Sequence, residues 1–335
     1  AYPRIYPGEE KFGRDEYFSG VKRVPLTTVQ KKGFDTLVHS AKSTWHILRN
    51  DTADIIHIQN GGNSPFAIVL RLFGKKTFIS QDGPDWERKK WPIYAKAYLW
   101  LTQFLTAYGP NGVIFDNVFV REYFENRFGR KYHFVPFGAD VIYDPKAEKV
   151  LERLGLEKGK YFLFVGRFIP DKGLHYLVEA FEGLNSPDMK LCIVGGSPNP
   201  SPYERQIRDT RDPRIQFPGY IYGAETHALM KNATAYIQPS DVEGLSPVIL
   251  ESAYLEAPII CSDIKQNRYI MEGNALYFEP GSTAGLRECM ERILSSPITA
   301  KERAKSGKLS IESRFSWDKV TANHMEIFNG AFQKN

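Results

Sequence analysis

The sequence has few cysteines, and they stand far apart. Of its 335 residues only three are cysteines, Cys192, Cys261 and Cys289. An odd number of widely spaced thiols excludes a disulfide framework and a cysteine-rich metal site. Because Cys192 and Cys261 lie inside apolar runs typical of strands, we expect buried thiols and a reducing, cytoplasmic compartment.

Three further absences narrow the class of protein. No apolar run reaches the roughly 18 residues that a membrane-spanning helix needs. No Gly-x-Gly-x-x-Gly follows a strand, which argues against a dinucleotide-dependent oxidoreductase. No Asp-x-Asp motif of the metal-binding type occurs either.

Positive charge is concentrated in the first part of the chain. Residues 1–140 hold 20 Lys and Arg against 14 Asp and Glu, whereas the remainder holds 24 against 25. One interpretation is a solvated basic surface. The other is a first domain that meets phosphate groups or an anionic lipid surface. We expect no nucleic-acid partner.

Short apolar runs alternate with longer helical patterns along the whole chain. This alternation predicts parallel sheets covered by helices on both faces, and therefore an α/β fold of two doubly wound, Rossmann-like domains. The predicted strands are 21–26, 55–59, 77–80, 113–115, 133–135, 161–165, 190–194, 214–217, 233–238, 258–261 and 275–278. The predicted helices are 37–48, 64–73, 93–106, 118–128, 175–184 and 247–255.

The pattern also predicts domain limits. We place a first domain at residues 1–141, a second at 142–314, and a C-terminal helical segment at 315–335 that crosses back to the first domain. Nothing before Val21 has the pattern of the buried strand that normally opens a doubly wound domain. We therefore expect the first domain to lack its first strand.

A strand that ends at Gly166 is followed by two cations, Arg167 and Lys172, and then by Gly173 and a helix. In open α/β sheets, ligands bind at the carboxyl ends of strands, where helix N-termini favour phosphate. These residues predict a diphosphate site; the alternative is an ordinary turn with surface cations. Gly195, at the end of the next strand, would let a ligand approach the backbone closely.

The segment Glu243-Gly-Leu-Ser-Pro-Val-Ile-Leu-Glu251 places two acids around a helix start. Ser246 is the expected N-cap, and Pro247 occupies a favoured early position in the helix. Carboxylates there could hold sugar and ribose hydroxyls while the helix end meets a phosphate. The alternative is a loop glutamate and a first-turn glutamate that favours the helix dipole.

Together these motifs resemble the large group 1 family of retaining GT-B glycosyltransferases. The order matches over residues 130–335: Gly-Arg followed by Lys-Gly, then Val194-Gly-Gly196, Phe217-Pro-Gly219, the Glu-x7-Glu pair, Pro258-Ile-Ile-Cys-Ser-Asp263, and Phe315-Ser-Trp-Asp-Lys-Val320. The resemblance implies two domains that face a cleft. In the first half, Asp82-Gly-Pro-Asp-Trp-Glu-Arg-Lys-Lys-Trp91 and neighbouring motifs resemble the rhamnosyltransferase-like branch of bacterial cell-surface polysaccharide synthesis.

The family resemblance implies a role for each donor-site residue. Arg167 and Lys172 would neutralise the diphosphate of a nucleotide sugar, and Glu243 would contact its sugar. Glu251 would hold the ribose. The other residues expected at the donor are Gly166, Gly195, Gly219, Tyr220, Gly244, Leu245 and Ser246. Asp82 is a candidate catalytic carboxylate in the first domain, or else a turn aspartate before Gly83.

The implied activity is metal-independent hexosyl transfer from a nucleotide sugar to a glycan or lipid-linked acceptor, with retention of configuration and no cofactor. The alternative is a GT-B protein that binds nucleotide sugars without turnover. The basic and aromatic segment 86–101 is either an ordinary domain helix or an interfacial helix. The second interpretation would make the protein peripheral on the inner face of the membrane.

Overall fold

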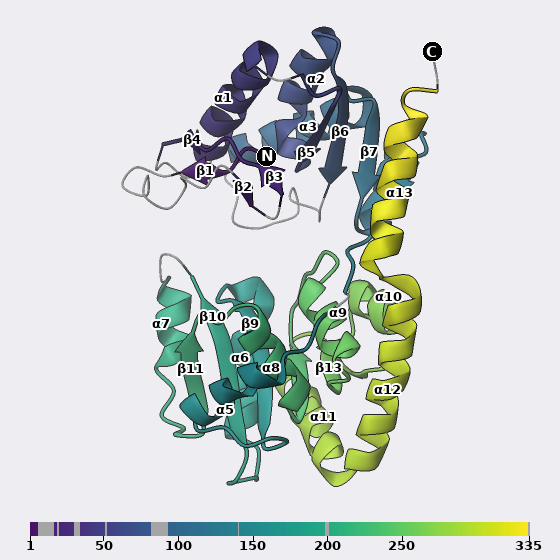
Figure 1. Cartoon of the computed structure of the whole chain (residues 1–335). Helices are drawn as coiled ribbons and strands as arrows, with labels where there is room; N and C mark the ends of the chain where they lie inside the picture. Colours follow the sequence, from purple (N-terminus) through teal and green to yellow (C-terminus); the bar gives the residue numbers. More distant parts are fainter. Residues whose placement is uncertain are drawn as a thin grey trace. The chain divides into compact units, whose positions relative to one another are not determined.

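The computed structural model describes residues 1–5, 17–18, 20–29, 34–50, 52–81, 93–139, 141–197 and 201–333. The chain divides into two compact units (Figure 1). Unit 1 comprises Ala1–Val135 and His324–Asn335, and unit 2 comprises Pro136–Asn323. The sequence predicts domain limits at 141/142 and 314/315, whereas the limits between the two units of the structure lie at 135/136 and 323/324.

Unit 2 is built on six parallel strands in the order β11-β10-β9-β12-β13-β14. The strands are β9 (Tyr161–Arg167), β10 (Lys190–Gly196), β11 (Ile215–Gly219), β12 (Ala235–Gln238), β13 (Ile259–Ser262) and β14 (Leu276–Phe278). Their runs of consecutive apolar residues are what a sheet buried on both faces requires. The predicted parallel α/β architecture is confirmed for this unit.

Helices cover both faces of the unit 2 sheet. On β9, Tyr161 and Leu163 point into one apolar cluster and Phe162 and Phe164 into the other, as the period of two along a strand demands. The first cluster is closed by α5 (Lys149–Arg153), α8 (Ala224–Asn232), α9 (Pro247–Tyr254), α10 (Lys265–Met271) and α12 (Pro297–Arg314). The second is closed by α6 (Leu174–Glu182), α7 (Pro202–Arg208) and α11 (Thr283–Ser295).

Unit 1 contains a four-stranded parallel sheet in the order β5-β6-β7-β8. These strands are β5 (Ile55–Gln59), β6 (Lys76–Gln81), β7 (Gly112–Phe115) and β8 (His133–Phe134). The helices are α1 (Phe34–Asn50), α2 (Ser64–Leu72), α3 (Ile93–Tyr108) and α4 (Val118–Phe128). A short 3₁₀ turn, η1 (Gly61–Asn63), lies between β5 and α2. Unit 1 thus follows the predicted strand–helix alternation from residue 34 onward.

The predicted single strand 21–26 is wrong. Within the described residues, β3 (Val21–Lys22) pairs antiparallel with β2 (Tyr17–Phe18), and β4 (Leu26–Thr27) pairs parallel with β1 (Arg4–Ile5). Pro25 lies between β3 and β4, and since proline has no N–H to donate, it interrupts a ladder. The expected absence of a first strand stays a prediction.

The C-terminal helix α13 (Trp317–Gly330) begins just after the buried Phe315. Its later turns pack on the unit 1 sheet: the ring of Phe328 lies 4.9 Å from that of Phe78 and 5.4 Å from that of His57. These aromatic contacts explain why the end of the chain groups with unit 1.

Two expectations from composition are met in the described part of the chain. The three cysteines are free and buried. None of the helices described is both long and apolar enough to span a bilayer.

Candidate functional site

The predicted donor-site residues gather at one edge of the unit 2 sheet. β9, β10, β11 and β12 are parallel neighbours, so their carboxyl ends emerge together. Gly166 and Arg167 end β9, Gly195 lies near the end of β10, and Gly219 ends β11. The structure therefore brings together residues that lie more than 50 positions apart in the sequence.

Lys172 and Glu243 form an ion pair at this edge. Nζ of Lys172 lies 2.5 Å from Oε1 of Glu243, and the two side chains are 21% and 8% exposed. An ion pair so withdrawn from solvent is screened less than a surface pair. The cation expected at the diphosphate and the acid expected at the sugar are thus direct neighbours.

A buried amide holds the acid from the other side. Nε2 of Gln238 donates to Oε1 of Glu243 at 2.8 Å, while Oε1 of Gln238 accepts from the hydroxyls of Tyr236 at 2.8 Å and Ser246 at 3.0 Å. Gln238 and Tyr236 are almost completely buried. Sequence reasoning missed both, although two polar side chains in an otherwise apolar strand were a visible signal.

Two loops are locked against each other beside the ion pair. Gly173 has φ +65°, and a Cβ added there would lie 2.0 Å from the carbonyl oxygen of Pro239. The amide of Asp241 also donates to the carbonyl of Asp171 at 3.0 Å. The loop after β9 is therefore seated on the loop after β12, which fixes Lys172 relative to Glu243.

The ends of β9 and β10 are bare backbone. Gly195 has φ +124°, and a Cβ there would lie 1.9 Å from the carbonyl oxygen of Gly166, so no side chain fits. Arg167 is exposed at the end of β9, and no ion pair of its guanidinium occurs among the residues described. A free guanidinium beside bare backbone is a suitable anion site.

The N-terminus of α9 lies on the same chain segment as Glu243. Ser246 is its N-cap, as predicted, and its Oγ accepts from the amide of Ile249 at 3.5 Å. Gly244 and Leu245 lead into this cap, and Pro247 opens the helix. Because Pro247 has no N–H and the amide of Ile249 is capped, the amide of Val248 is the donor that the first turn can offer to an oxygen-rich ligand.

Glu251 is half-buried and poorly supplied with donors. The imidazole of His227 lies beside it, with Nε2 3.8 Å from Oε2, and no hydrogen bond to this carboxylate occurs in the described part of the chain. Burial raises the pKa of Glu251, and burial also lowers the pKa of His227. A carboxylate left without donors is available for ligand hydroxyl groups.

The two acids share one buried neighbour. Burial, and next the negative charges of Glu243 and Glu251, raise the pKa of the Tyr236 hydroxyl. Since both carboxylates act on the same phenol, both lie near Tyr236.

An aromatic pair follows β11. Tyr220 and Tyr222 are stacked with ring centroids 5.9 Å apart and planes 7° apart, and both are largely exposed. A Cβ added at Gly196 would lie 3.5 Å from the Tyr220 ring, which places that ring over the end of β10. Tyr220 was predicted at the site, whereas Tyr222 was missed.

Other candidates fall elsewhere. Asp82 and the whole motif 82–91 that contains it lie outside the described residues, since β6 ends at Gln81 and the description resumes at Ile93. No group of three His, Cys, Asp or Glu side chains that could hold a metal ion is found in the ranges the structure describes.

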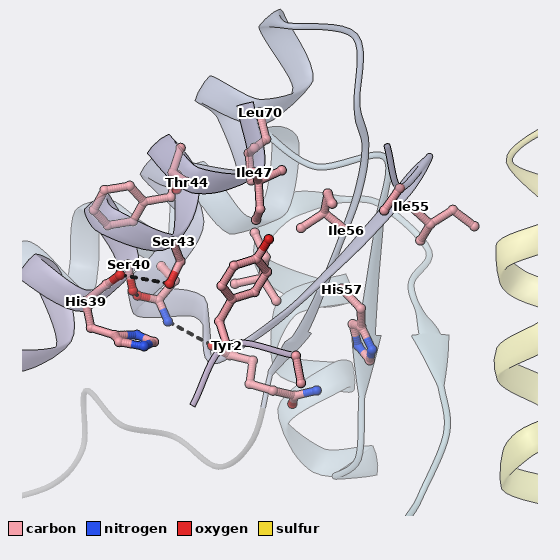
Figure 2. A pocket seen from close by; sticks show the side chains of 16 residues that line it. Tyr2, His39, Ser40, Ser43, Thr44, Ile47, Ile55, Ile56, His57 and Leu70 are labelled. Atoms are coloured by element: carbon pink, nitrogen blue, oxygen red, sulfur yellow. Dashed lines mark hydrogen bonds between the residues drawn. The ribbon is translucent and has the colours of Figure 1, made fainter. Parts of the chain in front are cut away.

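Unit 1 has a separate pocket of about 570 Å³ beside the edge strand β5 (Figure 2). Thr44 and Ile47 of α1 line one side, and Ile56 and His57 of β5 line another. Its serines are engaged: Ser40 donates to Asn63 at 2.8 Å, and Ser43 donates to the carbonyl of His39 at 2.9 Å. The pocket therefore offers mainly apolar contact.

Comparison with known proteins covers both units. Residues 147–310 match the family of glycosyl transferases group 1. A glycogen synthase of Mycobacterium tuberculosis is 28% identical over 174 residues, which are 50% of this chain and 42% of that protein. The D-rhamnosyltransferase WbpZ of Pseudomonas aeruginosa is 25% identical over 272 residues, 78% of this chain and 67% of that protein.

Among solved structures, HepE (Alr3699) of Anabaena, in complex with UDP and glucose, superposes with a TM-score of 0.80 at 16% identity. The match covers 93% of this chain and 86% of that one. The fold is therefore the predicted GT-B fold, α/β with two Rossmann-like domains. The chain spans about half the length of the first curated relatives it matches.

Proposed function

Since residues 147–310 match the group 1 glycosyltransferases, we propose that the chain transfers a sugar from a nucleotide-sugar donor to a glycan or lipid-linked acceptor. The observation that carries this proposal is the Lys172–Glu243 ion pair at the carboxyl edge of the sheet, with Glu251 on the helix that follows. A cation for phosphate and two acids for hydroxyl groups are what a donor of this class requires.

Different residues of the site bind different parts of the donor in this proposal. Lys172, Arg167 and the amides at the start of α9 meet the diphosphate, and Glu243 accepts from sugar hydroxyls. Glu251 accepts from the ribose, and the base lies near Tyr220. The HepE structure, which holds UDP and glucose, supports a donor of this kind.

Transfer proceeds when the acceptor oxygen bonds to the anomeric carbon and the bond to the diphosphate breaks. The electron pair stays on the leaving oxygen, which takes up the acceptor proton, and the cations stabilise the charge that develops there. We propose retention because the chain resembles the retaining group 1 family. Since no side chain of the described site is placed as a covalent nucleophile, we propose that the acceptor attacks the face that the diphosphate leaves.

We further propose that transfer needs no metal ion, because Lys172 and Arg167 provide the positive charge. Treatment with EDTA should leave the rate unchanged. A loss of activity that Mg²⁺ restores would overturn this point. Asp82 is proposed as a first-domain carboxylate that orients donor or acceptor.

One relative supports a more specific proposal for the sugar and the pathway. Similarity to the D-rhamnosyltransferase WbpZ supports hexosyl transfer of the rhamnosyltransferase-like kind, in bacterial cell-surface polysaccharide synthesis. The three buried free thiols support a cytoplasmic location, and a peripheral position on the inner face of the membrane would suit a lipid-linked acceptor.

The decisive experiment is a thermal-shift screen of the full chain against UDP-, GDP-, ADP- and dTDP-sugars. One nucleotide should raise the melting temperature, and the matching sugar should then be transferred with its anomeric configuration retained, as judged by NMR of the product. Stabilisation without hydrolysis or transfer would favour a binding protein without turnover. No stabilisation by any donor would contradict the proposal.

A further inference from the structure

Helix α3 of unit 1 buries polar side chains and exposes apolar ones. Thr102, Gln103 and Thr106 are buried, whereas Trp100 is 60% and Phe104 52% exposed. A surface helix of a globular protein normally has the opposite arrangement. The outward apolar side chains of this helix are Ile93, Trp100, Leu101, Phe104 and Tyr108, which we call the α3 face.

Hydrogen bonds hold α3 in this orientation. Thr106 donates through Oγ1 to the carbonyl of Gly61 at 3.2 Å, and Tyr98 donates to the carbonyl of Gly62 at 2.7 Å. The Oγ of Ser64 donates to the carbonyl of Thr102 at 3.2 Å. Rotating the helix to hide its apolar side would break these bonds and expose partners that are buried. The α3 face is therefore a fixed surface feature.

Two further exposed apolar side chains stand at the end of α2, which is tied to the end of α3. Arg71 donates through Nη1 to the carbonyl of Gly109 at 2.8 Å, which ties the last turn of α2 to the end of α3. Next to Arg71, Leu72 is 80% and Phe73 is 68% exposed. A large exposed apolar patch of this kind marks an interaction site.

Cations border the same surface. The guanidinium carbon of Arg127 lies 5.3 Å from the centroid of the Trp100 ring, and that of Arg130 lies 5.1 Å from the Tyr108 ring. Residues 64–81 and 93–131 together hold eight Lys and Arg against three Asp and Glu. One of these acids, Glu125, already pairs with Lys131 at 3.1 Å. Two arginines therefore border the patch, and the segments that carry it hold more basic than acidic residues.

We infer that the α3 face docks on an anionic lipid surface. Exposed tryptophan and tyrosine between arginines suit the boundary between headgroups and acyl chains, and each basic residue near an anionic membrane adds about 1 kcal/mol. A second copy of the chain fits less well, because a symmetric contact would bring one basic border against another. This inference rests on the proposed function in one respect, since the membrane would present the lipid-linked acceptor to the site.

The test is co-sedimentation of the full chain with two kinds of vesicle, at low and at physiological salt. One kind contains phosphatidylcholine alone, and the other contains phosphatidylcholine with about 30% phosphatidylglycerol, which gives it a negative surface charge. We expect binding to the anionic vesicles only. The variant Trp100→Ser with Phe104→Ser should weaken it by roughly tenfold or more, and Arg127→Glu with Arg130→Glu should do the same. The control is Ile298→Ser with Leu309→Ser, two exposed apolar residues of unit 2, which should bind as the parent does.

Other outcomes would overturn the inference. These are no sedimentation with either vesicle, equal binding to both vesicles, or full binding by the α3 variants. Concentration-dependent dimerisation that the Trp100→Ser and Phe104→Ser changes abolish, without vesicle binding, would assign the face to a second copy. Nucleotide binding, measured by thermal shift on the same variants, should be unchanged. A negative vesicle assay would therefore not contradict the proposed function, and a negative donor screen would not contradict membrane docking of the α3 face.

Discussion

Lys172 donates to Glu243 across 2.5 Å, and the acid is also held by the buried amide of Gln238. The two residues are 71 positions apart, and each was assigned to a different part of a donor molecule. In the free protein each satisfies the charge of the other. In the proposed donor complex Lys172 would be shared between the diphosphate and Glu243, which would couple phosphate binding to the placement of the sugar.

Replacing Glu243 by Gln should reduce turnover by about 100-fold, since the amide keeps the shape but not the charge that faces the sugar. Nucleotide affinity should change little, because the released Lys172 remains free for the diphosphate. Steady-state kinetics with calorimetry of the free nucleotide would check this. Glu302→Gln, at an exposed acid on α12, is the matched control. Turnover of E243Q near the parent rate would refute the role.

Removing the cation should cost stability as well as activity. In Lys172→Met, the carboxylate of Glu243, only 8% exposed, loses its cation, and unfolding of unit 2 should become easier by about 2 kcal/mol. The double variant K172M/E243Q should regain most of that stability and remain inactive. Chemical denaturation of all four proteins gives the coupling free energy. Additive losses in the double variant would show that the pair does not interact.

Gln238 is a positioning residue. Gln238→Leu removes the donor that orients Glu243 and leaves the hydroxyls of Tyr236 and Ser246 without their acceptor. We expect kcat to fall by about tenfold or more while the affinity for the nucleotide alone stays constant. A general structural defect would lower both. Gln206→Leu, at an exposed position of α7, serves as the control.

The sequence sufficed where the determinants of an element were local. Helix α4 was predicted at its observed limits, because Asn117 caps its start and Gly129 ends it in the left-handed conformation. The limits of the unit 2 strands were predicted to within two residues, because their apolar runs are bounded by polar residues and glycines. The role of Gln238 could not, because it depends on a loop that returns five residues later to place Glu243 over the amide.

The orientation of α3 could not be predicted from the sequence either. Apolar side chains occur all around this helix, so the pattern did not say which side faces inward. The hydroxyl of Thr106 turns inward and donates to the carbonyl of Gly61 in η1, and the carbonyl of Thr102 accepts from Oγ of Ser64 at the start of α2. Those partners come from a segment about 40 residues earlier, and no local rule reveals them.

Nucleotide affinity should depend on the protonation of Glu251. Burial raises the pKa of this carboxyl, so its charge is lost at a higher pH than for an ordinary glutamate. Because the ionised form is the better acceptor for ribose hydroxyls, affinity should fall as the pH is lowered from 7 toward 5. Calorimetry across this range should show the slope in the parent and a flat, weaker affinity in Glu251→Gln. Parallel curves for the two proteins would contradict the ribose contact.

Unit 1 should lose stability in mild acid through His57. Loss of hydration where the ring packs against Phe328, and next the nearby His324, lower the pKa of His57 to about 4 in the folded chain, against 6.5 for an ordinary histidine. Because the side chain of His57 is still exposed, solvent screening should keep the effect on stability small. Between these values the unfolded chain binds a proton that the folded chain does not, so the free energy of unfolding should fall as the pH drops from about 6.5 to about 4. Hydrogen exchange of β5 and β6 peptides at pH 7 and 5 would localise the effect. His57→Gln should remove this pH dependence and His324→Gln should reduce it, because the second change takes away one of the two causes; a slope that persists unchanged in H57Q would assign the acid sensitivity to another group.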